Sequence, residues 1–158
     1  MSGARIAFVV SRVLLGLVFV YAAIHKITYP PGFAKEIFAY GILPGGLVNL
    51  MAIYLPWIEL FAGLALVAGV WVRTAGSVTA GMLVVFLLAI GSRFARGEWD
   101  FECGCFPHTE SLVDRIPVVG HVWGFMFTSP KAWVTFARDV LLLGLAAFVI
   151  RQADRRPA

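Results

Sequence analysis

Cys103 and Cys105 are the two cysteines of the chain, and only Gly104 separates them. A disulfide between them would close almost no loop and would add little stability as a cross-link. Extended residues two apart place their Cα atoms about 6 to 7 Å from each other, near the upper limit for a disulfide. Glycine permits the unusual dihedral angles of so small a ring, and strained, exposed disulfides are the labile, oxidising kind. The spacing therefore predicts a thiol–disulfide exchange pair.

Two other interpretations of these cysteines stay open. A metal site would use Cys103 and Cys105 with His108, and with His121 as a further ligand. Zinc sites usually show wider cysteine spacing and four clear ligands, so we expect no metal here. The cysteines can also be loop residues without chemistry, in which case the loop serves only to dock a partner.

Three charged residues stand inside apolar stretches, namely Glu59, Arg138 and Asp139. A charge at the centre of a bilayer costs on the order of 3 kcal/mol even on lenient insertion scales, so such residues face a bundle interior and find partners. We expect Glu59 to pair with Arg138, with Arg12 as the rival partner. The pair would fix helix register, or it would belong to a proton relay or a quinone site.

Lys26 ends the first apolar stretch on the same side of the membrane as the cysteines. In one interpretation it is an anchor whose ammonium snorkels to the interface. In the other it lies beside the thiols and stabilises a thiolate, as nearby cations do.

The elements that must position these residues are membrane helices. Hydrophobic residues make up 60% of the 158-residue chain and charged residues only 14%, with a mean hydropathy of +0.86. A soluble domain of this size is nearer half apolar and a quarter charged. We therefore predict an all-α integral membrane four-helix bundle, forming one domain over residues 1–158 with a redox loop at about residues 95–131. The expected spans cover about residues 6–26, 47–72, 74–94 and 132–151.

Two connections are also predicted. Residues 32–40 place Phe33, Ile37 and Tyr40 on one helical face, which is typical of a short helix lying in the membrane interface. Almost nothing joins the second and third spans around Arg73, so these spans should form an antiparallel hairpin.

The basic residues indicate topology. A net charge of +4 is compatible with nucleic-acid binding, but the Lys and Arg residues flank apolar stretches and form no stripe, so we expect no nucleic-acid partner. Arg5 and Arg12 precede the centre of the first span, and Lys26 follows it. The first helix usually dominates orientation, which predicts a multi-pass protein of the inner (plasma) membrane with both termini in the cytoplasm and the cysteine loop outside.

Several local motifs resemble those of the MauE/DoxX-like family of small four-helix membrane proteins, over nearly the full length of the chain. The family pattern continues Cys-Gly-Cys-Phe with glycine, whereas Pro107 stands at that position here. The motifs that carry the resemblance are His25-Lys26-Ile27, Leu55-Pro56-Trp57-Ile58-Glu59, Cys103-Gly104-Cys105-Phe106 and Arg138-Asp139.

The resemblance implies a role in redox maturation. A protein of this family would help a thioredoxin-like protein outside the cytoplasm to make or rearrange disulfides in a client enzyme, which is methylamine dehydrogenase for the founding member. Distant relatives that are small subunits of thiosulfate:quinone oxidoreductase imply a second theme, in which a quinone accepts electrons. A third hypothesis is a non-catalytic membrane subunit or assembly factor that docks a partner.

Overall fold

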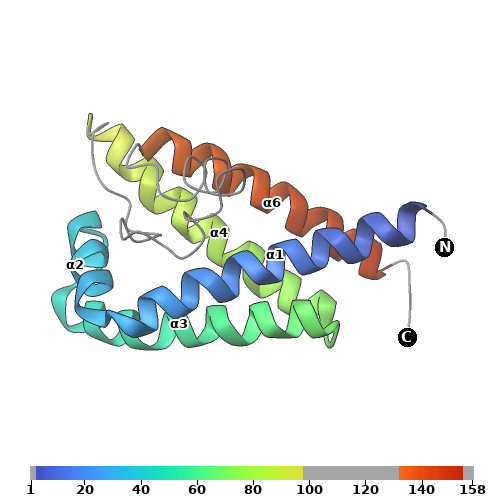
Figure 1. Ribbon diagram of the computed structural model, residues 1–158. Coiled ribbons are helices and arrows are strands. Elements are labelled where there is room, and N and C mark those ends of the chain that lie inside the picture. The colour runs from blue at the N-terminus through green and yellow to red at the C-terminus, as the bar shows by residue number, and fades with distance from the viewer. Residues whose placement is uncertain (1–2, 98–131, 155–158) are drawn as a thin grey trace, which may run out of the picture.

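The computed structural model describes residues 3–97 and 132–154, and in these ranges the chain is helical without strands. The four long helices are α1 (Gly3–Thr28), α3 (Gly45–Ala68), α4 (Val72–Ala95) and α6 (Ala132–Asp154), and the short α2 (Pro30–Tyr40) lies across one end of the bundle (Figure 1). Each long helix is long and apolar enough to cross a membrane. The expected all-α fold of a four-helix membrane bundle is confirmed.

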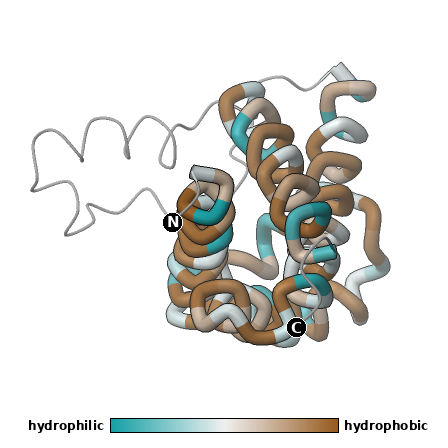
Figure 2. The backbone as a smooth tube through the Cα atoms, turned by 90° about the vertical axis from the view of Figure 1, so that its right-hand side faces the viewer, coloured by the Kyte–Doolittle hydropathy of each residue, from teal (hydrophilic) through white to brown (hydrophobic). Residues whose placement is uncertain are grey.

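The outer surface of the bundle is suited to lipid. In the most apolar window of each span, only 28% to 33% of the residues are buried inside the bundle. Large side chains such as Phe61, Val85 and Leu141 are exposed, and Figure 2 shows that hydrophobic residues dominate the long helices. Water would not tolerate so large an exposed apolar surface, whereas the hydrocarbon of a membrane does.

The helices pack as two antiparallel pairs. The larger contacts join α1 with α3 and α4 with α6, and smaller ones join α3 with α4 and α1 with α6 (Figure 1). In the half of the bundle nearer the termini the core is apolar, with Leu15, Leu66 and Val149 fully buried.

Two glycines bring α1 and α3 into backbone contact. A Cβ atom on Gly16 would lie 2.7 Å from the Gly63 carbonyl oxygen, and one on Gly63 would lie 2.8 Å from the Gly16 carbonyl oxygen. Each glycine also faces a valine of the other helix, Val67 opposite Gly16 and Val20 opposite Gly63. Small residues permit this approach in membrane helices, and here the contact fixes how α1 and α3 are aligned.

The turn between α3 and α4 differs from the expected one. α3 ends at Ala68 because Gly69 adopts a left-handed conformation with φ of 80°, and its N–H donates to the Ala65 carbonyl. Trp71 is also left-handed, with φ of 47°, and α4 begins at Val72. The hairpin was expected around Arg73, but the turn is made by residues 69–71.

α2 is the short helix that the sequence predicts, and its location in the membrane interface stays a prediction. It begins two residues earlier than expected, since Pro30 and Pro31 occupy its first positions, where a proline loses no hydrogen bond. It ends at Tyr40 because Gly41 is left-handed, with φ of 65°, and the Gly41 N–H donates to the Phe38 carbonyl.

Candidate functional site

Lys26 and Glu59 form a buried ion pair between α1 and α3. The Lys26 Nζ atom lies 2.7 Å from Glu59 Oε1 and 2.9 Å from Oε2, so it donates to both carboxylate oxygens. Lys26 is 5% exposed and Glu59 is 1% exposed. Burial removes most of the hydration of both charges, and their mutual attraction offsets part of that cost.

Two aromatic rings enclose the Lys26 ammonium. Its Nζ atom is 4.8 Å from the centroid of the Phe33 ring and 4.8 Å from that of the Phe86 ring. Phe33 belongs to α2 and Phe86 to α4, so this ammonium contacts side chains from three other helices. Cation–π contacts of this kind strengthen when they are desolvated. Lys26 is thus a junction of α1, α2, α3 and α4.

Arg138 and Asp139 form a second buried pair on α6. Arg138 donates through Nε and Nη2 to Asp139 Oδ1, at 3.1 and 2.8 Å. Arg138 is 6% exposed and Asp139 is 3% exposed. A guanidinium stays charged in proteins, so this pair carries a permanent cation within a membrane span.

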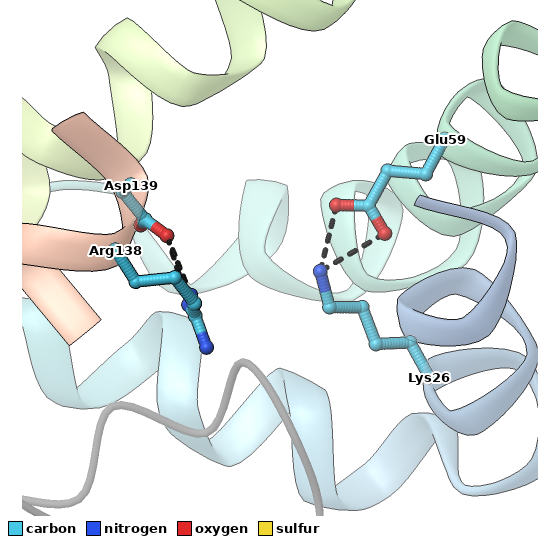
Figure 3. A network of polar contacts seen from close by, with 4 residues as sticks. All are labelled: Lys26, Glu59, Arg138 and Asp139. Atoms are coloured by element: carbon cyan, nitrogen blue, oxygen red, sulfur yellow. Dashed lines mark hydrogen bonds and ion pairs between the residues drawn. The ribbon is translucent and has the colours of Figure 1, made fainter. Parts of the chain in front are cut away.

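A small cavity separates the two pairs. Figure 3 shows Lys26 and Glu59 on one side and Arg138 and Asp139 on the other. All four side chains line the cavity, whose volume open to the centre of a water molecule is about 30 Å³. That is room for about two waters beside four polar groups. The rest of its lining comes from Val18, Phe19, Ala22, Leu83, Phe86 and Leu142.

The four groups behave electrostatically as one cluster. Two cations face two carboxylates, so the cluster has no net charge when all are ionised, and the Lys26 charge also attracts the Asp139 carboxylate. A neutral set of paired charges is the arrangement that hydrocarbon tolerates best. We call Lys26, Glu59, Arg138 and Asp139 the buried charge cluster.

The expected pairing of Glu59 with Arg138 is wrong. Lys26 takes both oxygens of Glu59, and Arg138 binds the neighbouring Asp139 instead. The rival partner, Arg12, lies in the first half of α1, away from Glu59. Its guanidinium lies against Gly69 at the C-terminal end of α3. A cation is favourable there, because helix carbonyls end without partners and the helix dipole is negative.

Lys26 does not snorkel to the interface, since it is buried beside Glu59. Its other expected role, stabilising a thiolate, stays a prediction. Cys103 and Cys105 lie outside the described residues, as do His108 and His121. Among residues 3–97 and 132–154, no three His, Cys, Asp or Glu side chains gather as metal ligands would.

The structure does fix where the cysteine-bearing part of the chain leaves and rejoins the bundle. It follows α4 and Gly97, and it returns at the start of α6, at the same end as α2 (Figure 1). The buried charge cluster lies in the half of the bundle nearer this end, because Lys26 is two residues from the end of α1 and Arg138 is in the second turn of α6.

Sequence reasoning missed two features at this end. One is Phe33 as a ring against Lys26, although its place on the apolar face of residues 32–40 indicated burial. The other is Arg93 of α4 with Arg96, the C-cap of that helix, which donate to the Ala39 and Tyr40 carbonyls of α2. Their three-residue spacing puts both on one helix face, and that spacing was the available signal.

The helices and the buried charge cluster define the class of protein. It is a small multi-pass α-helical membrane protein with paired charges inside its bundle. The chain belongs to the MauE family: residues 4–152 match the family model described as "Methylamine utilisation protein MauE". The resemblance seen in the sequence is confirmed.

Curated relatives carry the same description. The chain is 33% identical over 102 residues to the methylamine utilization protein MauE of Methylophilus methylotrophus, an alignment covering 65% of this chain and 54% of that protein. It is 26% identical over 135 residues to the MauE protein of Paracoccus denitrificans, covering 85% of this chain and 63% of the relative. The chain thus spans little more than half the length of these relatives. No solved structure matches it.

Proposed function

We propose that this protein supports thiol–disulfide exchange, through Cys103 and Cys105, in the maturation of an extracytoplasmic enzyme of methylamine utilisation. The observation that carries the proposal is the spacing of the two cysteines, which favours a reactive disulfide over a stabilising one. The relatives' printed description supports the metabolic context.

The exchange balances in thiols and electrons. One Cys thiolate attacks a disulfide of a thioredoxin-like partner, which releases one partner thiolate and forms a mixed disulfide. The second cysteine then attacks the sulfur of the first, which forms the Cys103–Cys105 disulfide and releases the second partner thiolate. The partner gains two electrons and the cysteine pair loses two. The reverse direction oxidises the partner by the same steps.

The proposed orientation places the cysteines outside the cytoplasm and both termini inside, in the inner membrane. The first helix supports it, because Arg12 lies in the first half of α1 and Lys26 follows near the end of α1, and the first helix usually dominates orientation.

Lys26 has a proposed structural role in this chemistry. Its ammonium is already paired with Glu59, so the buried charge cluster would present no net charge to the thiols. The Lys26–Glu59 pair would then act mainly by holding α1 and α3 in register.

Complementation in the native host tests the proposal. A strain lacking the protein should recover maturation of its client enzyme with the wild-type chain but not with the Cys103→Ser, Cys105→Ser double variant. Activity of the client in extracytoplasmic extracts is the measurement, with immunoblotting of the membrane protein as the control for expression. Full recovery by the double variant would favour a subunit that only docks a partner.

A further inference from the structure

A groove in the lipid-facing surface lies along the seam between α3 and α4. These two helices contact each other less closely than the partners within either antiparallel pair do. The volume of the groove, again as space open to the centre of a water molecule, is about 240 Å³. The described residues that line it are all apolar, namely Leu55, Val78, Gly81, Met82, Val85 and Phe86.

The groove opens toward the hydrocarbon of the membrane. A Cβ atom on Gly81 would meet nothing within 4 Å, so the missing side chain of this glycine leaves the space free. Val85, one turn further along α4, is 64% exposed. Leu55 and Met82 lie near the middle of their helices, at a depth where lipid chains and not water surround the bundle. A molecule that enters the groove must therefore be soluble in lipid.

The groove adjoins the buried charge cluster. Phe86 forms part of the wall of the groove and part of the wall of the cavity between the two ion pairs. Its ring is the one whose centroid lies 4.8 Å from the Lys26 Nζ atom. Met82 lines the groove, and the next residue, Leu83, lines the cavity. The partly buried Phe86 side chain thus stands between the hydrocarbon and the charged groups.

The charge cluster offers a donor and an acceptor to a ligand. An ammonium has three N–H groups, and Lys26 uses two of them on Glu59. Arg138 makes both of its bonds to Oδ1 of Asp139, and within residues 3–97 and 132–154 no hydrogen bond reaches Oδ2. Lys26 and Asp139 line the same cavity, only 5% and 3% exposed (Figure 3). A hydroxyl group matches both, because it accepts from an ammonium and donates to a carboxylate.

The size and charge of the cavity restrict the polar end of such a ligand. The cavity has room for about two waters, so one hydroxyl group fits where a phosphate group does not. The cluster has no net charge, so it attracts no ionised head group, and an ionised group would also have to pass the apolar groove at high cost. A hydroxyl group can displace a water and take over its hydrogen bonds.

We propose that this cavity binds the hydroxyl group of an uncharged, lipid-soluble molecule whose apolar part lies in the α3–α4 groove. The site is separate from the cysteine pair, and the inference does not rest on the proposed function. The hydroxyl can stand on an alkyl chain, as in a lipid alcohol, or on a ring, as in a quinol. Both carry the same hydrogen-bonding group, and the test distinguishes them.

The test uses the purified full chain in liposomes and dodecanol that carries a photoactivatable diazirine in its chain. After illumination, mass spectrometry should find the label on Leu55 or on residues 78–86. Unlabelled dodecanol or a decyl-substituted hydroquinone should displace it, and displacement by only one of them assigns the hydroxyl to a chain or to a ring. Dodecane and dodecyl phosphate should not displace it. In Asp139→Asn, displacement should need about ten times more competitor, as loss of a hydrogen bond to a charged group would cause.

Gly81→Leu fills the groove and should abolish the label. Gly91→Leu is the matched control, since it adds the same side chain to α4 at a position that is equally open but lies outside the groove lining. This variant should be labelled like the wild type. Thermal midpoints of both should stay near that of the wild type, because neither added Cβ meets another atom. Equal labelling of the two variants would overturn the proposed site. So would displacement by dodecane as effective as that by dodecanol, because lipid chains alone would then occupy the groove.

Discussion

The Lys26 ammonium donates to both oxygens of the Glu59 carboxylate, at 2.7 and 2.9 Å, across 33 residues of sequence. The pair continues the alignment that Gly16 and Gly63 set, at a level of the bundle nearer α2. Backbone contact at one level and an ion pair at another leave little freedom for α3 to slide or rotate on α1. The register of α3 on α1 in turn places Glu59 beside the cavity that it shares with Arg138 and Asp139.

Removing one partner of this pair should destabilise the bundle strongly. Glu59→Met leaves Lys26 buried without its carboxylate, and Lys26→Met leaves Glu59 buried without its ammonium. Each change should lower the free energy of unfolding by about 3–5 kcal/mol. The double variant Lys26→Met with Glu59→Met should be milder than either, since two apolar side chains need no partner there. Unfolding in mixed micelles measures all three.

The exposed pair Arg73 and Asp154 provides the control for that cycle. Its atoms are 2.9 Å apart, close to the buried distance, but the side chains are 75% and 43% exposed. Single changes to Gln and Asn there should cost only about 0–1 kcal/mol. The Lys26–Glu59 pair contributes no coupling if the buried single variants lose no more free energy of unfolding than the exposed ones. The same conclusion follows if the loss in the buried double variant equals the sum of the two single losses.

The helix contact at Gly16 gives a second prediction. Gly16→Ala places a Cβ atom against the Gly63 carbonyl and the Val67 side chain, so α1 must move away from α3. The free energy of unfolding should fall by about 1–3 kcal/mol, as overpacking usually costs. Gly144→Ala in α6 is the control, because nothing lies within 4 Å of its added Cβ. Equal stability of the two variants would mean that the close approach contributes nothing.

The sequence predicted the spans well, and the reason is physical. A helix that crosses hydrocarbon needs about 20 apolar residues and satisfies its own backbone, so composition alone locates it. The end of α3 was placed too late because Val70, Trp71 and Val72 are as apolar as the span itself. The left-handed backbone at Gly69 ends the helix there, and hydropathy does not report it.

The buried charges were recognised, but their partners were not. Apolar surroundings identified Glu59, Arg138 and Asp139 as residues that need partners, whatever the fold. Which cation meets Glu59 depends on the rotation of α1 about its axis, which the Gly16–Gly63 contact determines. Lys26 also looked like an interfacial anchor because it is close to the end of α1. Its burial comes from the packing of α2, α3 and α4 around that end, with Phe33, Glu59 and Phe86 against the ammonium.

The proposed orientation is tested by labelling. After mild reduction of intact spheroplasts, Cys103 and Cys105 should react with a membrane-impermeant maleimide, because the arginines at the opposite end should hold that end in the cytoplasm. A variant with Ser at both positions and a new cysteine at Ala158 is the control, and it should label only after lysis. The reverse pattern for the two proteins would place the cysteines in the cytoplasm and exclude an extracytoplasmic partner.

The exchange chemistry itself predicts a covalent intermediate. A single cysteine still attacks a partner disulfide, but without the second thiol the mixed disulfide is not resolved. Cys103→Ser or Cys105→Ser should therefore keep the partner attached through a mixed disulfide. The wild type and the double variant should not. Either cysteine can make the first attack, so both single variants are tested.

Trapping of that intermediate is the most direct measurement of the central claim. Each variant is expressed in the native host, thiol exchange is stopped with acid, and free thiols are then blocked with a maleimide. The tagged protein is separated by gel electrophoresis without and with reductant. At least one single variant should carry a reducible adduct with a thioredoxin-like protein, identified by mass spectrometry, and the double variant should carry none. If neither single variant retains such an adduct while both still support client maturation, Cys103 and Cys105 do not exchange disulfides.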